Sequence, residues 1–106
     1  PVMPTIGASA QMLRPGERTR AHRHTGSFVY QVAKGSGYSV IEGVRYVWTE
    51  RDIFVIPSWA AHEHANASAT DPAFLFCFHD LPVMRSLGIF REAALEEAHQ
   101  TITRTA

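Results

Sequence analysis

Short strand-like runs separated by turn residues are the feature of this sequence that most restricts its fold. Over residues 1–80 the apolar residues follow no helical period, and runs of four to six residues rich in Val, Ile, Phe and Tyr alternate with Gly and Pro. We expect strands at residues 9–13, 28–33, 38–41, 44–48, 53–56 and 74–78. Glu42-Gly43 should form a hairpin turn, because glycine tolerates a positive φ. This pattern predicts an all-β sandwich or barrel.

The chain has 106 residues, which suffices for one hydrophobic core. We expect a single domain over residues 1–106, with a strand-rich body at about 4–80 and a helical tail at about 82–100. Within the tail, residues 91–100 contain good helix formers and predict a short C-terminal helix. Phe74, Phe76 and Phe78 alternate onto one face, which we expect to be core, with Cys77 on the opposite face.

The charge balance excludes two classes of partner. Ten Lys and Arg balance ten Asp and Glu, so we expect neither nucleic acid nor an anionic membrane to be bound. A single cysteine cannot form an internal disulfide and favours a reducing, cytoplasmic location. The chain begins at Pro1, so it is expected to be a processed product, an artificially trimmed chain or one half of a longer chain.

Three histidines have the spacing of a metal site. His22 and His24 lie two residues apart, and such side chains share one face of an extended chain. His62 follows a predicted strand and can supply a third imidazole. Neutral imidazole binds iron, zinc, nickel and copper, and three of them leave positions open for water, substrate or dioxygen. We interpret the three as ligands of one divalent metal ion, although a His-X-His pair also occurs by chance on surfaces.

Two segments around these histidines resemble known motifs. Residues 16–35 are similar to the first cupin motif and residues 57–66 to the second, which implies a cupin jelly-roll β-barrel with a short C-terminal helix. The first motif usually carries a glutamate ligand where this chain has Phe28 or Val29. The site therefore resembles three-histidine cupins. The alternative is a degenerate cupin whose histidines are buried and hydrogen-bonded.

A wider similarity covers residues 4–95. The segments HRHTGSFVYQVAKGSGYSVIEG, FVIPSWAAHEHAN and LFCFHDLPVMRSLGIFREA resemble the C-terminal cupin of gentisate 1,2-dioxygenase-type bicupins. The resemblance implies Fe(II) held by three histidines and an extradiol-type cleavage, by O2, of the ring of gentisate or a related hydroxybenzoate. Imidazole ligands alone also suit Mn, Ni, Zn and Cu. The alternative is a metal-binding cupin of other activity, or a non-catalytic cupin half with a structural or assembly role.

The same resemblance indicates two substrate-facing residues. His64 lies two residues beyond His62, and the resemblance implies a substrate-contacting or proton-transfer group there; a partly exposed loop histidine is the alternative. Tyr30 stands where the related enzymes carry an arginine that holds the substrate carboxylate, and it offers one hydrogen bond in place of a bidentate charged one. The partners implied are a small aromatic acid and O2. We also expect a homodimer, or packing against a second cupin.

Overall fold

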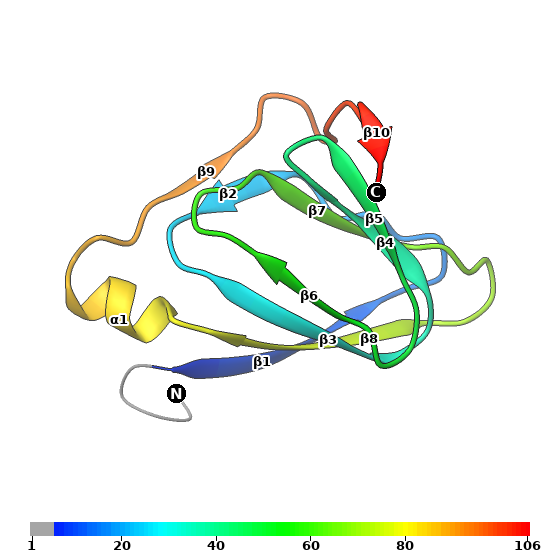
Figure 1. The fold of residues 1–106 in the computed structure, drawn as a ribbon, viewed down its shortest axis with the longest axis horizontal. Helices are drawn as coiled ribbons and strands as arrows, with labels where there is room; N and C mark the ends of the chain where they lie inside the picture. Colours follow the sequence, from blue (N-terminus) through cyan, green and yellow to red (C-terminus); the bar gives the residue numbers. More distant parts are fainter. Residues whose placement is uncertain (1–5) are drawn as a thin grey trace.

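The structure, a computed structural model, describes residues 6–106, so the predicted start of the strand-rich body near residue 4 lies outside the described residues. The elements follow in the order β1 (Gly7–Leu13), β2 (His22–His24), β3 (Phe28–Lys34), β4 (Gly37–Ile41), β5 (Val44–Trp48), β6 (Ile53–Ile56), β7 (His62–Asn66), β8 (Ala73–His79), α1 (Leu81–Ser86), β9 (Glu92–Ala94) and β10 (Arg104–Thr105) (Figure 1). Each of the six predicted strands is present, within two residues at each end. The short strands β2 and β7, which carry the predicted metal ligands, were not among them.

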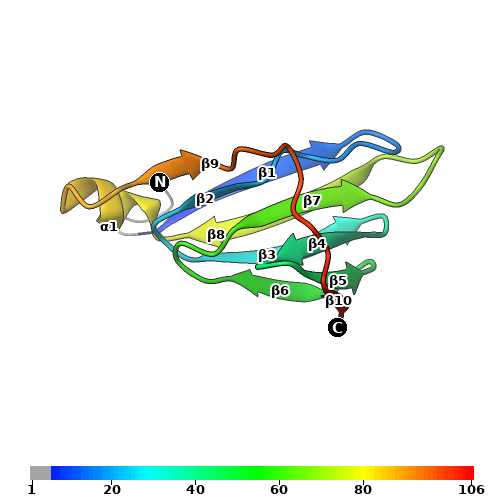
Figure 2. The ribbon, with the colours of Figure 1, turned by 90° about the horizontal axis from the view of Figure 1, so that it is seen from above.

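Two sheets face each other across the core. One sheet has the order β1-β8-β3-β6 and the other the order β10-β5-β4-β7-β2-β9, as Figures 1 and 2 show. Large apolar side chains from both sheets fill the space between them, among them Leu13, Val32, Trp48, Ile56 and Leu75. The predicted jelly-roll arrangement is confirmed, although the hydrogen-bonded ladders of the described residues stay in two sheets and do not close into one ring.

The turn at Glu42-Gly43 joins β4 to β5 as predicted. Both residues have positive φ, 49° and 77°, which matches the right-handed twist of a tight hairpin. Ile41 pairs directly with Val44 across this turn. The turn therefore fixes the β4–β5 register.

The prediction for the phenylalanines of β8 was wrong. Phe74, Phe76 and Phe78 are 38%, 39% and 48% exposed, while the residues that alternate with them, Ala73, Leu75 and Cys77, are buried. Residues paired across an antiparallel ladder share a face, and Cys77 pairs with the buried Tyr30. Both faces of β8 are apolar, so its sequence showed the alternation without showing which face is inside.

The predicted helix at residues 91–100 was also wrong. The helix in this region is α1, which begins with Leu81-Pro82 and ends before Gly88. Residues 92–94 instead form β9, which pairs with β2 and covers its edge. An open sheet edge offers unpaired backbone groups, and this pairing outweighs a modest helix propensity. None of the helices in residues 6–106 has the length and apolar character needed to span a membrane.

The chain after β9 crosses the outer face of the six-stranded sheet. We call residues 95–101 the C-terminal strap; it passes over β7 and β4 on the way to β10 (Figure 2). The amide of Ala21 donates to the carbonyl of Ala98 at 2.7 Å, and Leu95 donates back to Ala21 at 3.3 Å. Because the strap covers one face and the opposite sheet covers the other, every residue of β7 is buried. This is the strand that carries His62 and His64.

Candidate metal centre

His22, His24 and His62 meet on the inner face of the six-stranded sheet. β2 and β7 are antiparallel neighbours in which His22 pairs directly with His62, and His24 lies two residues further along β2. The ring centroids are separated by 4.5 Å, 4.9 Å and 5.5 Å. One ring nitrogen of each histidine lies within 4.8 Å of the others. Nitrogens bound at about 2.1 Å to one ion lie up to about 4 Å apart, so small side-chain rotations suffice to bind it.

Backbone carbonyls orient all three rings. Each Nδ1 faces the carbonyl oxygen of a residue close in sequence. The distance is 3.2 Å from His22 to the carbonyl of Arg20, 3.2 Å from His24 to that of Thr25, and 2.9 Å from His62 to that of Ala60. A carbonyl oxygen can only accept, so Nδ1 carries the proton in each neutral ring and Nε2 keeps its lone pair. Such partners are typical of metal-ligating histidines, because they fix the tautomer and the ring direction. The donor set thus fits a divalent metal ion.

Burial keeps two of these rings neutral. His24 is 7% exposed and His62 is 2% exposed, whereas His22 is half-buried. Burial, together with the nearby His22 and His24, lowers the pKa of His62 to about 4. Burial also lowers the pKa of His24, and the charge of Glu92, its cross-strand neighbour on β9, acts in the opposite direction. Neutral imidazole is the ligand form, so protons do not compete for the buried pair near pH 7.

His64 lies on the inner face beside this group. It is 3% exposed, and its ring centroid lies 5.8 Å from that of His62. Burial lowers the pKa of His64 to about 3, so its ring is neutral. Its Nε2 is buried and has no hydrogen-bond partner among residues 6–106. The open alternative of an exposed loop histidine is wrong, because β7 is an interior strand.

Tyr30 also points inward, as the alternation of β3 predicts. Its side chain is 6% exposed, and its ring lies 4.8 Å from that of His64 and is stacked on Phe54 at 5.1 Å. Burial raises the pKa of Tyr30, so the hydroxyl keeps its proton and can donate. Phe28 packs against His24 at 4.6 Å between ring centroids. Aromatic rings of Phe28, Tyr30 and Phe54 therefore border His24 and His64.

Two residues beside His64 were not singled out as functional from the sequence. Ser39 lies opposite His64 in the β4–β7 ladder, and its hydroxyl contacts Nδ1 of His64. Trp48 on β5 donates a hydrogen bond to the same hydroxyl oxygen. A serine inside an apolar strand is a weak signal by itself, and only the register shows which histidine it meets. Trp48 is buried in the core.

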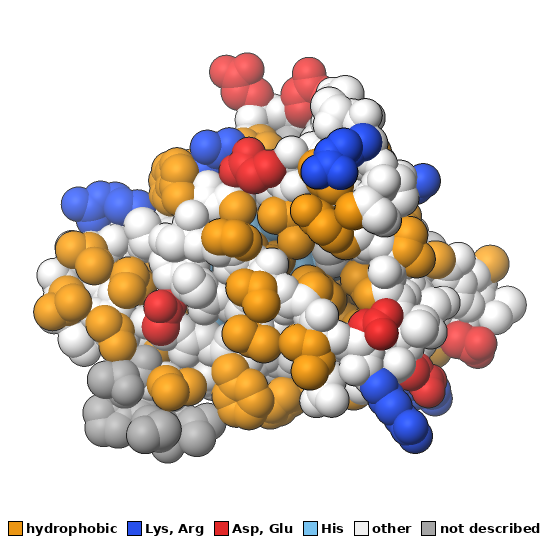
Figure 3. All heavy atoms as spheres, viewed as in Figure 1, with side chains coloured by type: hydrophobic (Ala, Val, Ile, Leu, Met, Phe, Trp, Pro, Cys, Tyr) orange, Lys and Arg blue, Asp and Glu red, His pale blue; other side chains and the backbone are white. Residues whose placement is uncertain are grey.

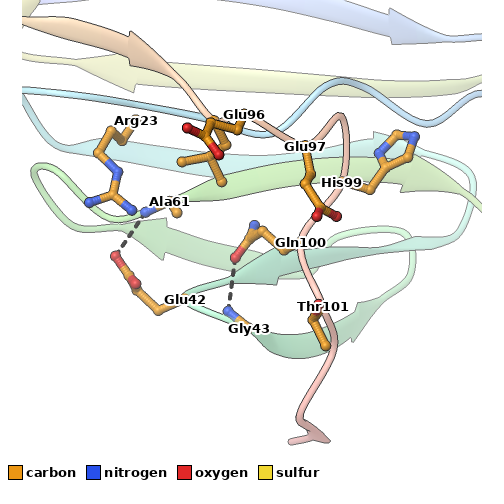
Figure 4. Close-up of a pocket in the computed structure, with 10 residues that line it drawn as sticks. Arg23, Glu42, Gly43, Ala61, Glu96, Glu97, His99, Gln100 and Thr101 are labelled. Atoms are coloured by element: carbon orange, nitrogen blue, oxygen red, sulfur yellow. Dashed lines mark hydrogen bonds between the residues drawn. The ribbon is translucent and has the colours of Figure 1, made fainter.

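A pocket of about 460 Å³ lies outside the two-sheet interior, between the C-terminal strap and the outer face of the six-stranded sheet (Figure 4). Arg23, Glu42, Glu97 and His99 are among its lining residues, and none of the three grouped histidines lines it. Arg23 alternates with His22 and His24 along β2, which places it on this outer face beside Trp59. The pocket is therefore separate from the candidate metal centre.

Comparisons with known proteins agree with this geometry. The family described as "Cupin domain" matches residues 10–79. The chain is 50% identical to 5-aminosalicylate 1,2-dioxygenase from Comamonas sp over 97% of its own length and 28% of that protein's. It is 36% identical to gentisate 1,2 dioxygenase 1 from Aquipseudomonas alcaligenes, covering 86% of the chain and 25% of that protein.

Solved structures give the same result. A salicylate 1,2-dioxygenase variant from Pseudoaminobacter salicylatoxidans in complex with gentisate superposes with a TM-score of 0.84 at 32% identity, over 91% of this chain and 26% of that one. The chain thus spans about a quarter of the length of the proteins it matches.

Proposed function

The chain belongs to the cupin family, and on this premise we propose that it is the metal-binding cupin of a non-haem Fe(II) dioxygenase that cleaves the ring of gentisate or a related hydroxybenzoate. The observation that carries the proposal is the group of His22, His24 and His62, whose Nδ1 atoms are all anchored on backbone carbonyls. The names of its relatives support the substrate class, since they specify 1,2-dioxygenases of gentisate, 5-aminosalicylate and salicylate.

The three histidines would hold the ion through Nε2. When bound, Fe(II) supplies a centre at which dioxygen and the aromatic acid can react. The group contains no carboxylate, so the donor set leaves the double positive charge of the ion uncompensated. An anionic hydroxybenzoate, with its carboxylate and hydroxyl oxygens, offers the missing negative charge. Mn, Ni, Zn and Cu also suit imidazole ligands, and metal analysis distinguishes them.

His64 and Tyr30 would contact the substrate. His64 presents a buried, unpartnered Nε2 beside the metal group, and Tyr30 offers a protonated hydroxyl from the facing sheet. A neutral tyrosine gives one hydrogen bond where an arginine would give two charged ones. The aromatic rings of Phe28 and Phe54 provide apolar contacts for a substrate ring. Histidine atoms are visible between apolar side chains near the centre of the view in Figure 3.

An alternative function is a non-catalytic cupin half with a structural or assembly role. Two observations favour it: the chain spans about a quarter of its relatives' length, and the outer face of the four-stranded sheet exposes apolar side chains that include Val29, Val55 and Phe78. Under either function this face would pack against a second copy or a second cupin.

The buried free thiol of Cys77 is consistent with a cytoplasmic location.

A single experiment separates the two functions. The chain is loaded with Fe(II) without oxygen, mixed with gentisate, 5-aminosalicylate or salicylate, and exposed to air. Ring cleavage gives oxygen consumption and a product that absorbs in the near ultraviolet, and the His62→Ala variant should give neither. Bound metal without turnover on any of the three acids would overturn the dioxygenase proposal and favour the structural role.

A further inference from the structure

His64 shares the inner face of β7 with His62, but its ring has different neighbours. Its Nδ1 lies 2.7 Å from the hydroxyl oxygen of Ser39 on β4. The same oxygen accepts a hydrogen bond from Nε1 of Trp48 on β5 at 2.9 Å. Ser39 is 0% exposed, and His64 and Trp48 are each 3% exposed, so water cannot replace a missing partner.

The hydroxyl hydrogen of Ser39 decides the tautomer of His64. If this hydrogen points to Nδ1, both groups are satisfied and the ring proton sits on Nε2. If Nδ1 carries the proton instead, the hydroxyl hydrogen has no acceptor, because Nδ1 of His64 and Nε1 of Trp48 are the only partners of Ser39 Oγ among the described residues. Each buried donor without an acceptor costs about 1–3 kcal/mol. The first arrangement leaves one polar atom of this set unpaired, and the second leaves two.

The atom left unpaired in the favoured arrangement is the Nε2–H of His64. It is the buried His64 nitrogen that lacks a partner within residues 6–106. The three grouped histidines have the opposite arrangement, with Nδ1 donating to a carbonyl and the lone pair on Nε2. An Nε2 that carries a proton cannot bind a metal ion, but it can donate to an oxygen.

We propose that Ser39 is a positioning residue that holds His64 as the Nε2–H tautomer, so that His64 donates a hydrogen bond to an anionic oxygen of the bound aromatic acid and does not become a fourth metal ligand. Trp48 donates to the Ser39 oxygen and so holds it in place beside Nδ1 of His64. The choice of an aromatic acid as ligand rests on the proposed function, whereas the tautomer does not. A histidine that donates selects a ligand with a negatively charged oxygen over a neutral isostere.

The tautomer is measurable in the metal-free chain without any turnover. Nitrogen chemical shifts of ¹⁵N-labelled histidine should show His64 protonated at Nε2. Trp48→Phe should keep this form, because the Ser39 hydroxyl remains, whereas Ser39→Ala should give a mixture of both forms. Ser9→Ala is the matched control, since it removes a hydroxyl bonded to Cys77 on the other sheet. A wild-type His64 protonated at Nδ1 would overturn the proposal, even if Ser39→Ala failed to fold.

The role in ligand selection is measured by binding. Zn(II), which does not react with oxygen, replaces iron, and salicylate is titrated into the wild type and the Ser39→Ala variant. We expect salicylate to bind about tenfold more weakly to the variant, because a hydrogen bond to a charged oxygen is lost. Zinc content should not change, and the affinity for neutral salicylamide should fall less than that for salicylate, because a hydrogen bond to a neutral oxygen is weaker. Equal salicylate affinity, or a loss of zinc in Ser39→Ala, contradicts the proposal. If the wild type binds no zinc, the proposed function is wrong. The protonation of His64 in the metal-free chain then still tests whether Ser39 sets its tautomer.

Discussion

His62 and His64 lie two residues apart on one face of β7, yet the atoms beside their Nδ1 positions differ. A backbone carbonyl faces Nδ1 of His62, and a serine hydroxyl faces Nδ1 of His64. The carbonyl can only accept, whereas the hydroxyl can also donate, so the two rings favour opposite tautomers. At the scale of the residue, the neighbour of Nδ1 and not the residue type separates a candidate metal ligand from a hydrogen-bond donor.

Removal of one ligand tests the metal centre directly. In His62→Ala two imidazoles remain, and we expect the affinity for Zn(II) or Fe(II) to fall by at least about 100-fold, since even the loss of a supporting contact costs about 10–100-fold. Isothermal titration of the metal-free chain measures this. His79→Ala is the control, because His79 lies at the end of β8 outside the group. A variant that keeps its metal would show that the ion binds elsewhere.

Acid should destabilise the metal-free chain. Burial lowers the pKa of His62 to about 4, while an unfolded histidine titrates near ~6.5. Between these values the unfolded state binds more protons, so the free energy of unfolding is highest above pH ~6.5 and falls as the pH decreases towards 4. Urea denaturation at pH 7, 6, 5 and 4.5 measures the slope. His62→Gln should make the slope shallower, while the lowered pKa values of His64 and His24 keep part of it, and a flat wild-type curve would contradict the prediction.

At the scale of the element, β7 depends on the C-terminal strap. Glu63 is 0% exposed and faces away from the histidines, towards the strap. Its carboxylate accepts from the backbone amide of Gln100 and from His99 in the strap, and it pairs with Arg18 at 2.7 Å. A carboxylate is stable in such a position only when it is paired and hydrogen-bonded. The strap thus makes β7 an interior strand on both faces.

Glu63→Ala should loosen this strap. The variant removes the acceptor of three hydrogen bonds and leaves a cavity, and we expect the free energy of unfolding to fall by about 2–4 kcal/mol. Amide hydrogen exchange at Gln100 should become faster. The exposed Glu97 also belongs to the strap, so Glu97→Ala is a control that should change stability by less than about 0.5 kcal/mol. Equal effects of the two variants would show that the buried carboxylate does not hold the strap.

At the scale of the whole molecule, the two sheets present different outer faces. The strap covers part of the six-stranded sheet, whereas the four-stranded sheet exposes a group of large apolar side chains, namely Met12, Val29, Ile53, Val55, Phe74, Phe76 and Phe78. Figure 3 shows apolar side chains grouped over β3, β6 and β8. Monomeric proteins rarely expose apolar patches of more than a few hundred Å², which supports the proposed packing of this face against a second copy or a second cupin.

Charges placed on this face should reduce self-association. Val55 and Phe78 are 53% and 48% exposed, so the double variant Val55→Lys, Phe78→Lys should fold normally. We expect it to sediment as a monomer at concentrations where the wild type sediments as a dimer, because unpaired charges cannot be buried in an interface. Val47→Lys is the control, since Val47 is 68% exposed on the other sheet. If the control separates the copies as well, they associate through a different face.

The sequence by itself determined six of the strands, the hairpin at Glu42-Gly43 and the candidate ligands, because these depend on local periodicity, turn residues and the spacing of His22 and His24. The tertiary structure decided the rest. Which face of β8 is inside depends on its register with β3, and residues 92–94 are a strand because β2 leaves an edge to pair. Likewise, Ser39 meets His64 only through the β4–β7 ladder. Contacts between residues far apart in the chain set these features, and no local pattern encodes them.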